Sequence, residues 1–180
     1  MKSEQYQLKK AAEDIGASVN ANKSSETQSM IGKVVQKGFS PKDAMGLTDA
    51  MVEGIYGQAY RLYNTGKYKD ANQLFRLLIM LNTTEPKYTM GLAACFHMLK
   101  EYKAAADVYA LVTVIDAKSP IPFYHASDCF IQMGDNPSAI IALQMAVERA
   151  GDNQAFKTLK DRALLTIESL QKQMNRLKTK

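Results

Sequence analysis

The chain has 180 residues, of which 46% are hydrophobic and 23% charged, and its net charge at neutral pH is +5. This composition supplies an ordinary globular core and excludes a protein that is disordered over most of its length. The longest apolar run, Leu77 to Leu81, is far shorter than the ~20 residues of a membrane-spanning helix, and the first ten residues lack the apolar core of a secretory signal.

The N-terminal part of the chain is polar at first and helical later. Residues 1–27 carry few apolar anchors, and we expect them to form a mobile segment. Residues 28–51 form a predicted N-terminal helical region, in which Gly38 ends one helix and Pro41 begins a short second one. Its apolar residues recur at helical spacing: Met30, Ile31, Val34 and Val35.

A period of 34 residues dominates the middle of the chain. The repeat windows are 52–85, 86–119 and 120–151, and several positions hold similar residue types in all three or in two of them. Small residues, large residues and turn residues coincide as follows: Ala59, Ala93 and Ser127; Ala71, Ala105 and Ala139; Leu62, Phe96 and Phe130; Phe75, Tyr109 and Leu143; Gly66, Lys100 and Gly134. So many coincidences at one constant period exclude chance.

The residue types at these positions predict pairs of antiparallel helices. Small residues let two helices approach closely at their crossing, large residues fill the space beside it, and Gly66 and Gly134 suit a tight turn. Pro86 and Pro120 begin new repeats, because proline is tolerated in the first turn of a helix. This is the tetratricopeptide pattern, so we predict an all-α fold with three repeats in a right-handed superhelix.

The segment 152–180 is predicted to be a basic C-terminal helix. It contains seven basic and three acidic residues, which is most of the excess positive charge of the chain. A solvated helix face explains this pattern best, although a basic helix can also contact nucleic acid or an acidic partner.

The first helix of the first repeat carries two stripes of side chains. Ile55, Ala59 and Leu62 form the packing face, and the tyrosines at positions 56, 60 and 63 form a second stripe rotated by about 100°. In this fold the second stripe faces the concave groove, and tyrosine suits the grip of an extended peptide. The alternative is that these rings pack against neighbouring helices.

Catalytic and metal-binding patterns are not evident in the sequence. His97 and His125 lie on separate repeats, there is no glycine-rich phosphate loop, and no Cys/His cluster has zinc spacing. Cys95 and Cys129 occupy equivalent positions in adjacent repeats. Equivalent atoms of packed helix pairs are separated by about 8–10 Å or more, which is beyond the reach of a disulfide. We therefore expect buried thiols, no metal or other cofactor, and no enzymatic activity.

Three segments resemble class II chaperones of bacterial type III secretion systems: 55–71, 88–95 and 123–129. The resemblance extends from about Gln28 to Ala150 and includes positions beyond the generic repeat. It implies a cytoplasmic chaperone that keeps hydrophobic translocator proteins soluble and apart until export. The groove of such chaperones receives a short extended segment with spaced prolines and an aliphatic residue.

The resemblance also implies site residues and partners. The positions that match the peptide-contacting residues of the family are Tyr56, Tyr60, Tyr63, Met90, His97 and Tyr124. N-terminal helices mediate homodimerisation in several members, so a homodimer is expected. Some members also pair with an AraC-type transcriptional activator.

Other functions of a tetratricopeptide fold remain open at this point. One is a peptide-binding scaffold that acts as a coregulator of a transcriptional activator. Another is a cochaperone that clamps a C-terminal carboxylate, which requires lysine and asparagine where this chain has Tyr56 and Tyr60. A third, direct binding of nucleic acid, requires a reading element such as a helix-turn-helix, and none is evident.

Overall fold

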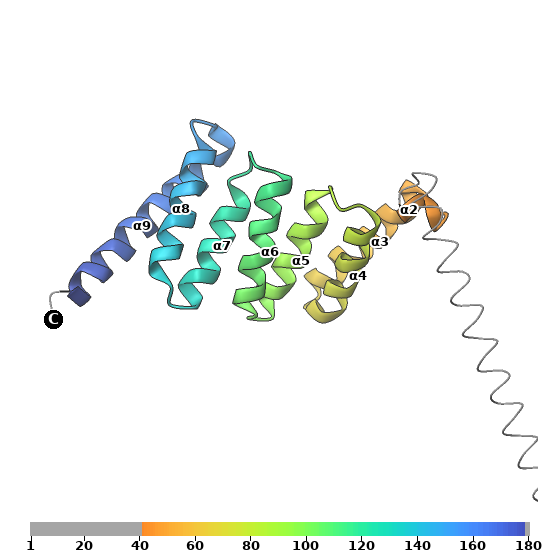
Figure 1. Ribbon diagram of the computed structural model, residues 1–180, viewed down its shortest axis with the longest axis horizontal. Coiled ribbons are helices and arrows are strands. Elements are labelled where there is room, and N and C mark those ends of the chain that lie inside the picture. The colour runs from red at the N-terminus through yellow and green to blue at the C-terminus, as the bar shows by residue number, and fades with distance from the viewer. Residues whose placement is uncertain (1–40, 179–180) are drawn as a thin grey trace, which may run out of the picture. The chain divides into compact units, whose positions relative to one another are not determined.

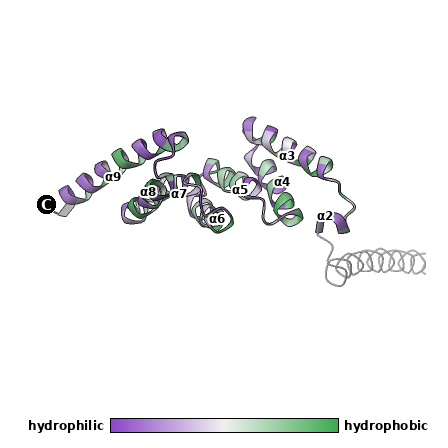
Figure 2. Cartoon of the chain, turned by 90° about the horizontal axis from the view of Figure 1, so that it is seen from above, coloured by the Kyte–Doolittle hydropathy of each residue, from purple (hydrophilic) through white to green (hydrophobic). Residues whose placement is uncertain are grey.

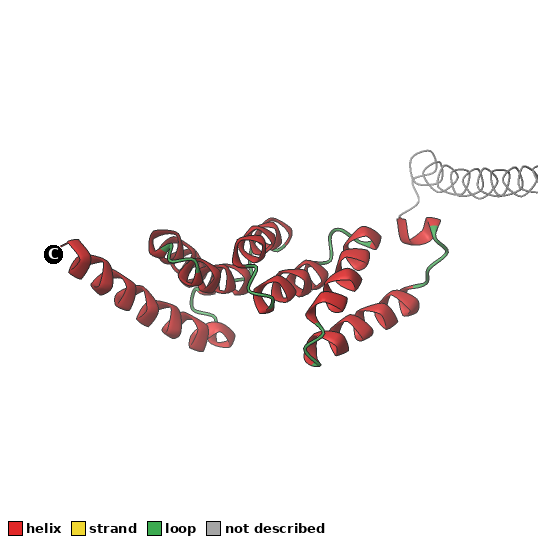
Figure 3. Ribbon diagram, turned by 90° about the horizontal axis from the view of Figure 1, so that it is seen from below, coloured by secondary structure: helices red, strands yellow, loops and turns green. Residues whose placement is uncertain are grey.

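A computed structural model of the chain describes residues 41–178. The expected mobile segment 1–27 and the helix with Met30, Ile31, Val34 and Val35 lie outside the described residues. The chain divides into two compact units, Met1–Asp49 and Ala50–Lys180. The described part is helical with connecting loops and contains no strand, which confirms the predicted all-α class (Figure 3).

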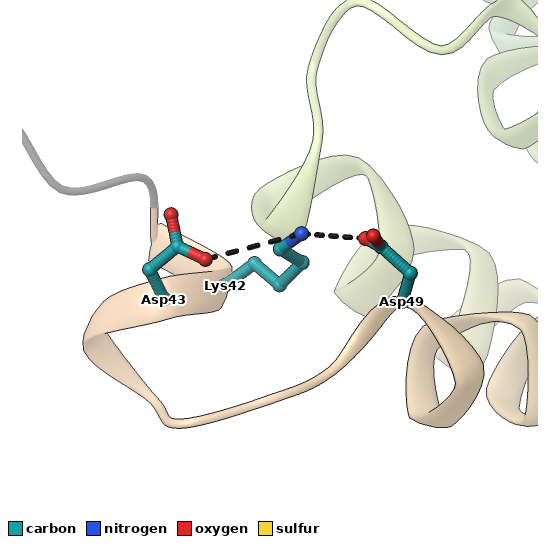
Figure 4. A network of polar contacts seen from close by, with 3 residues as sticks. All are labelled: Lys42, Asp43 and Asp49. Carbon is teal, nitrogen blue, oxygen red and sulfur yellow. Dashed lines mark hydrogen bonds and ion pairs between the residues drawn. The ribbon is translucent and has the colours of Figure 1, made fainter.

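The described end of the first unit is a short helix, α2, at Pro41–Ala44. Proline begins it, as predicted, and Gly46 follows it with a φ of +69°. Lys42 extends across the turn, with its Nζ 2.5 Å from Asp49 Oδ1 and 3.9 Å from Asp43 Oδ1 (Figure 4). One lysine therefore pairs with two carboxylates in this turn.

The second unit is built from successive helix pairs that lie side by side in chain order (Figure 1). The first helices of the pairs are α3 at Asp49–Asn64, α5 at Pro86–Met98 and α7 at Ile121–Gln132. The second helices are α4 at Tyr68–Leu81, α6 at Tyr102–Ile115 and α8 at Asn136–Ala150. A 3₁₀ turn, η1 at Gln154–Phe156, leads into α9 at Lys157–Lys178.

Small residues mark the places where helices pack closely. Ala59, Ala71, Ala93, Ala105 and Ala139 have no exposed surface, as the repeat pattern predicts. Two core clusters continue along the unit. One joins α5, α6 and α7 around Tyr109, and the other joins α8 and α9 through Leu143, Ala163 and Leu170.

The curvature of the second unit places α3 and α9 on the same side of the helices between them (Figure 2). Hydrophilic residues lie along much of α9, and several of its cations are paired. Lys157 and Lys172 pair with acidic residues one helical turn away, and Lys160 Nζ donates to the Gly151 carbonyl at the end of α8 (2.6 Å). The basic helix is therefore stabilised in part by local ion pairs and by the helix dipole of α8.

The turns within the three helix pairs share one backbone conformation. Gly66, Lys100 and Gly134 all have positive φ, at 78°, 62° and 75°. In each turn the residue that follows donates its backbone N–H to a carbonyl of the preceding helix, as in Lys67 to Leu62 (2.9 Å). Lys100 thus adopts a left-handed conformation that its side chain disfavours.

Lys100→Gly is expected to stabilise the protein by about 1 kcal/mol, because glycine adopts positive φ without a Cβ penalty. The melting temperature should rise by roughly 2–4 °C. Gly66→Ala and Gly134→Ala are the matched controls and should lower it. A lower melting temperature for Lys100→Gly would show that the lysine side chain makes a compensating contact.

Candidate functional site

The candidate site is a stripe of side chains on the first helices of the three pairs, which we call the groove face. It comprises nine positions, three on each of α3, α5 and α7: Tyr56, Tyr60 and Tyr63; Met90, Ala94 and His97; Tyr124, Asp128 and Ile131. Eight of these side chains are half-buried. Tyr60 is exposed, with 55% of its surface accessible.

Tyr56 is held by rings from three helices. Its centroid lies 6.4 Å from that of Tyr60, 6.3 Å from that of Phe75 on α4 and 5.7 Å from that of Tyr88 on α5. Lys87 covers the ring, with Nζ 4.7 Å from its centroid, and also bonds Glu53 Oε1 at 2.6 Å. Tyr56 therefore contributes to the packing of α3 against the next repeat as well as to the groove face.

Tyr63 lies near the end of α3 and packs edge-on against Tyr68 of α4, with centroids 5.4 Å apart. Burial raises the pKa of the Tyr63 phenol, and the neighbouring Tyr68 and Cys95 add to this effect. The Tyr63 hydroxyl therefore stays protonated at neutral pH and can donate a hydrogen bond to a peptide carbonyl.

On α5, Met90 packs against the core cluster around Tyr109. His97 makes edge-on contacts with Tyr102 and Tyr109 of α6, at 5.8 and 6.4 Å between centroids. Burial lowers the pKa of His97, although the nearby Asp128 carboxylate opposes this shift. His97 is therefore neutral at pH 7 and offers both a hydrogen-bond donor and an acceptor.

On α7, Tyr124 packs against the cluster that joins α8 and α9 and contacts His125 edge-on at 5.9 Å. Among the ring contacts of residues 41–178, none joins a tyrosine of α3 to His97 or Tyr124. The six residues predicted from the sequence thus form an aromatic wall on α3 and separate contact points on α5 and α7.

Three residues near the predicted positions were not among the site residues predicted from the sequence: Tyr109, His125 and Asp128. The Tyr109 ring stacks on His125, with centroids 5.6 Å apart and planes 23° apart. Asp128 stands where the earlier repeats have Tyr60 and Ala94. The 34-residue period was the available signal, because it marks Asp128 as the position at which the third repeat departs from the first two.

The two cysteines are free and fully buried, which confirms the prediction of structural thiols. Burial raises the pKa of both Cys95 and Cys129 to about 11. The thiolate is the reactive form, so the native protein should resist thiol reagents at pH 8.

We therefore expect Ellman's reagent at pH 8 to modify neither cysteine in native protein and both in denaturant. Because the folded-state pKa exceeds the unfolded one, the cysteines favour the folded state fully below pH 9. This contribution should be lost as the pH rises toward 11. Rapid labelling of native protein would contradict the assigned burial.

A separate hollow of about 300 Å³ lies between α6, α7 and α8. Its lining is apolar apart from two hydroxyls, and it includes Phe123, Phe130, Ile141 and Met145. Within residues 41–178, no group of three or more His, Cys, Asp or Glu side chains is placed to hold a metal ion. None of the described helices is long and apolar enough to cross a membrane.

Comparison with known proteins identifies families and proteins that are similar to this chain. The family model of the tetratricopeptide repeat matches residues 52–82 and 86–118. The chain is 31% identical over 141 residues to the chaperone protein SicA of Salmonella typhimurium, which covers 78% of this chain and 83% of SicA.

Solved structures of chaperones also match this chain. The type III secretion translocator chaperone SycD of Yersinia enterocolitica matches with a TM-score of 0.68 and 29% identity, over 72% of this chain and 89% of SycD. SycD has also been solved as an alternative dimer and with a peptide of the translocator YopD. PcrH of Pseudomonas aeruginosa, bound to the chaperone-binding region of PopD, matches with a TM-score of 0.68 and 29% identity, over 72% of this chain and 97% of PcrH.

Proposed function

Since this chain belongs to the class II chaperones of type III secretion translocators, we propose that it binds hydrophobic translocator proteins through its groove face. Binding keeps these proteins soluble and apart from each other before export. The relatives support this function rather than that of a coregulator scaffold, because the matching complexes contain translocator segments.

The exposure of Tyr60 is the observation that carries the proposal for the site. Its ring is 55% exposed, whereas Val52 and Ala59 on the same helix are buried. An exposed ring beside half-buried Tyr56 and Tyr63 leaves an apolar wall open to a ligand. We assign peptide contact to Tyr56, Tyr60, Tyr63, Met90, His97 and Tyr124.

An extended segment suits this wall for a physical reason. A strand-like peptide places alternate side chains into successive pockets along a surface, and prolines reduce the entropy lost when the segment becomes ordered. The proposed activity is binding without catalysis, in the bacterial cytoplasm. An AraC-type activator as a second partner stays a prediction from the family resemblance.

The test is co-expression of the tagged chaperone with the translocators of its own secretion system, followed by purification and mass spectrometry. We expect one translocator per complex, and we expect each translocator to aggregate when expressed alone. If both translocators stay soluble without the chaperone, or neither copurifies with it, the proposed function is wrong.

We also propose a homodimer in which residues 28–51 contribute to the interface. SycD, a relative, has been solved in more than one dimer arrangement. Light scattering of the full chain and of a variant lacking residues 1–39 tests this assignment. A monomer in both cases would refute the dimer, and a dimer in both would show that residues 28–39 are not needed for the interface.

A further inference from the structure

The chemical character of the groove face changes along the chain. Its α3 positions are three tyrosines, whereas its α7 positions are Tyr124, Asp128 and Ile131. Asp128 is the one acidic residue among the nine positions of the groove face. A carboxylate in an aromatic surface is costly unless it has a partner, so its surroundings indicate what it binds.

The Asp128 carboxylate has only a weak partner in the described chain. Its Oδ2 lies 3.9 Å from His125 Nδ1, and the Asp128 side chain is 41% exposed. None of the ion pairs found in residues 41–178 joins Asp128 to a lysine or arginine.

A buried phenol, that of Tyr109, lies against the histidine that pairs with the carboxylate. Tyr109 is 2% exposed, and its hydroxyl makes no hydrogen bond to a residue that the structure describes. Among the described residues, Thr89 Oγ1 is the only side-chain oxygen that has no hydrogen-bond partner and is fully shielded from solvent. Because the Tyr109 oxygen has no partner either, it must keep some contact with solvent. Burial raises the pKa of Tyr109, and the charge of Asp128 adds to this shift. His125 lies between the two groups, since its ring stacks on Tyr109 and its Nδ1 is 3.9 Å from Asp128 Oδ2.

Aromatic rings complete the surroundings of Asp128. His125 stacks on Tyr109 and contacts Tyr124 edge-on, and His97 approaches Tyr109 from α5. One carboxylate, one free phenol oxygen and the faces of several rings together favour a cation. Such a group gains a charge-assisted hydrogen bond to the carboxylate and an attraction to the ring faces.

We propose that Asp128, Tyr109 and His125 form a subsite for a lysine or arginine side chain of the bound translocator segment. This inference rests on the proposed function and adds a charged anchor to the proline and aliphatic contacts of the groove. A neutral side chain at the same place would leave the carboxylate partly desolvated and unpaired, which lowers affinity.

The test uses a short synthetic peptide with two prolines, a leucine between them and glutamine elsewhere. Each glutamine is replaced by lysine in turn, and binding is measured by fluorescence anisotropy at pH 8, where an ordinary imidazole is neutral. At one position, or two adjacent ones, lysine should bind about ten-fold tighter than glutamine.

Two variants of equal charge separate a specific contact from general attraction. Asp128→Asn should abolish the lysine preference. Asp107→Asn should keep it, because Asp107 is an exposed residue of α6 that pairs with Lys103 outside the groove face. Tyr109→Phe removes only the hydroxyl and should reduce the preference about three-fold.

The outcomes distinguish this inference from the proposed function. Equal binding of the lysine and glutamine peptides at every position overturns the subsite, and so does a preference that persists in Asp128→Asn. Binding of the all-glutamine peptide would leave the proposed function standing in either case. If no peptide of the series binds, the subsite and the groove assignment both fail.

Discussion

Tyr60→Ala is expected to weaken binding of the proline-containing peptide by about thirty-fold, with little change in the melting temperature. Tyr60 is more than half exposed, so its removal creates no cavity. The ring nevertheless supplies a large flat surface to a peptide that lies against α3, and aromatic side chains that become buried on binding often dominate binding energies.

Tyr56→Ala provides the informative contrast. Its ring contacts Phe75 and Tyr88 and is covered by Lys87, so truncation should lower both the affinity and the melting temperature. Met80→Ala, at an exposed position of α4, is the control that should change neither. If Tyr60→Ala binds the peptide normally, the aromatic wall of α3 is not the binding surface.

Gly91→Ala is expected to destabilise the protein by about 1–3 kcal/mol, because a Cβ at this position overlaps with the Phe75 ring. Phe75 is 2% exposed, so its ring is enclosed by other core side chains. The melting temperature should fall by several degrees in thermal denaturation followed by circular dichroism.

Gly57→Ala is a matched control, since Gly57 occupies the same repeat position and a Cβ added there would meet no atom within 4 Å. Alanine is the better helix former, so Gly57→Ala should stabilise the protein by about 0.5–1 kcal/mol. Phe75→Leu combined with Gly91→Ala should recover part of the loss, because the two sites are in contact. Equal effects of the two glycine substitutions would contradict the packing of Phe75 on Gly91.

The same repeat position shows how one interface varies along the chain. Phe75 fills the space over Gly91, whereas the equivalent Tyr109 stacks on His125. Glycine therefore packs against the phenylalanine ring between the first and second repeats, and histidine packs against the tyrosine ring between the second and third repeats. This exchange brings an imidazole next to Asp128 in the third repeat, with His125 Nδ1 3.9 Å from the carboxylate.

The sequence alone determined the helix pairs, their turns and their close crossings. These features depend on residue types at a fixed 34-residue spacing, and they include the turn at Lys100, where the residue itself is not a glycine. Helical periodicity also identified the stripe of tyrosines on α3, because it sets which residues share a face of one helix.

Only the tertiary structure decided how far each residue of that stripe is available to a ligand. Tyr56 and Tyr60 look equivalent in sequence, yet Phe75, Tyr88 and Lys87 from other helices cover the first and leave the second exposed. The meeting of Tyr109, His125 and Asp128 was likewise not predictable. Contacts between helices depend on how they pack and on side-chain rotamers, and spacing along the chain specifies neither.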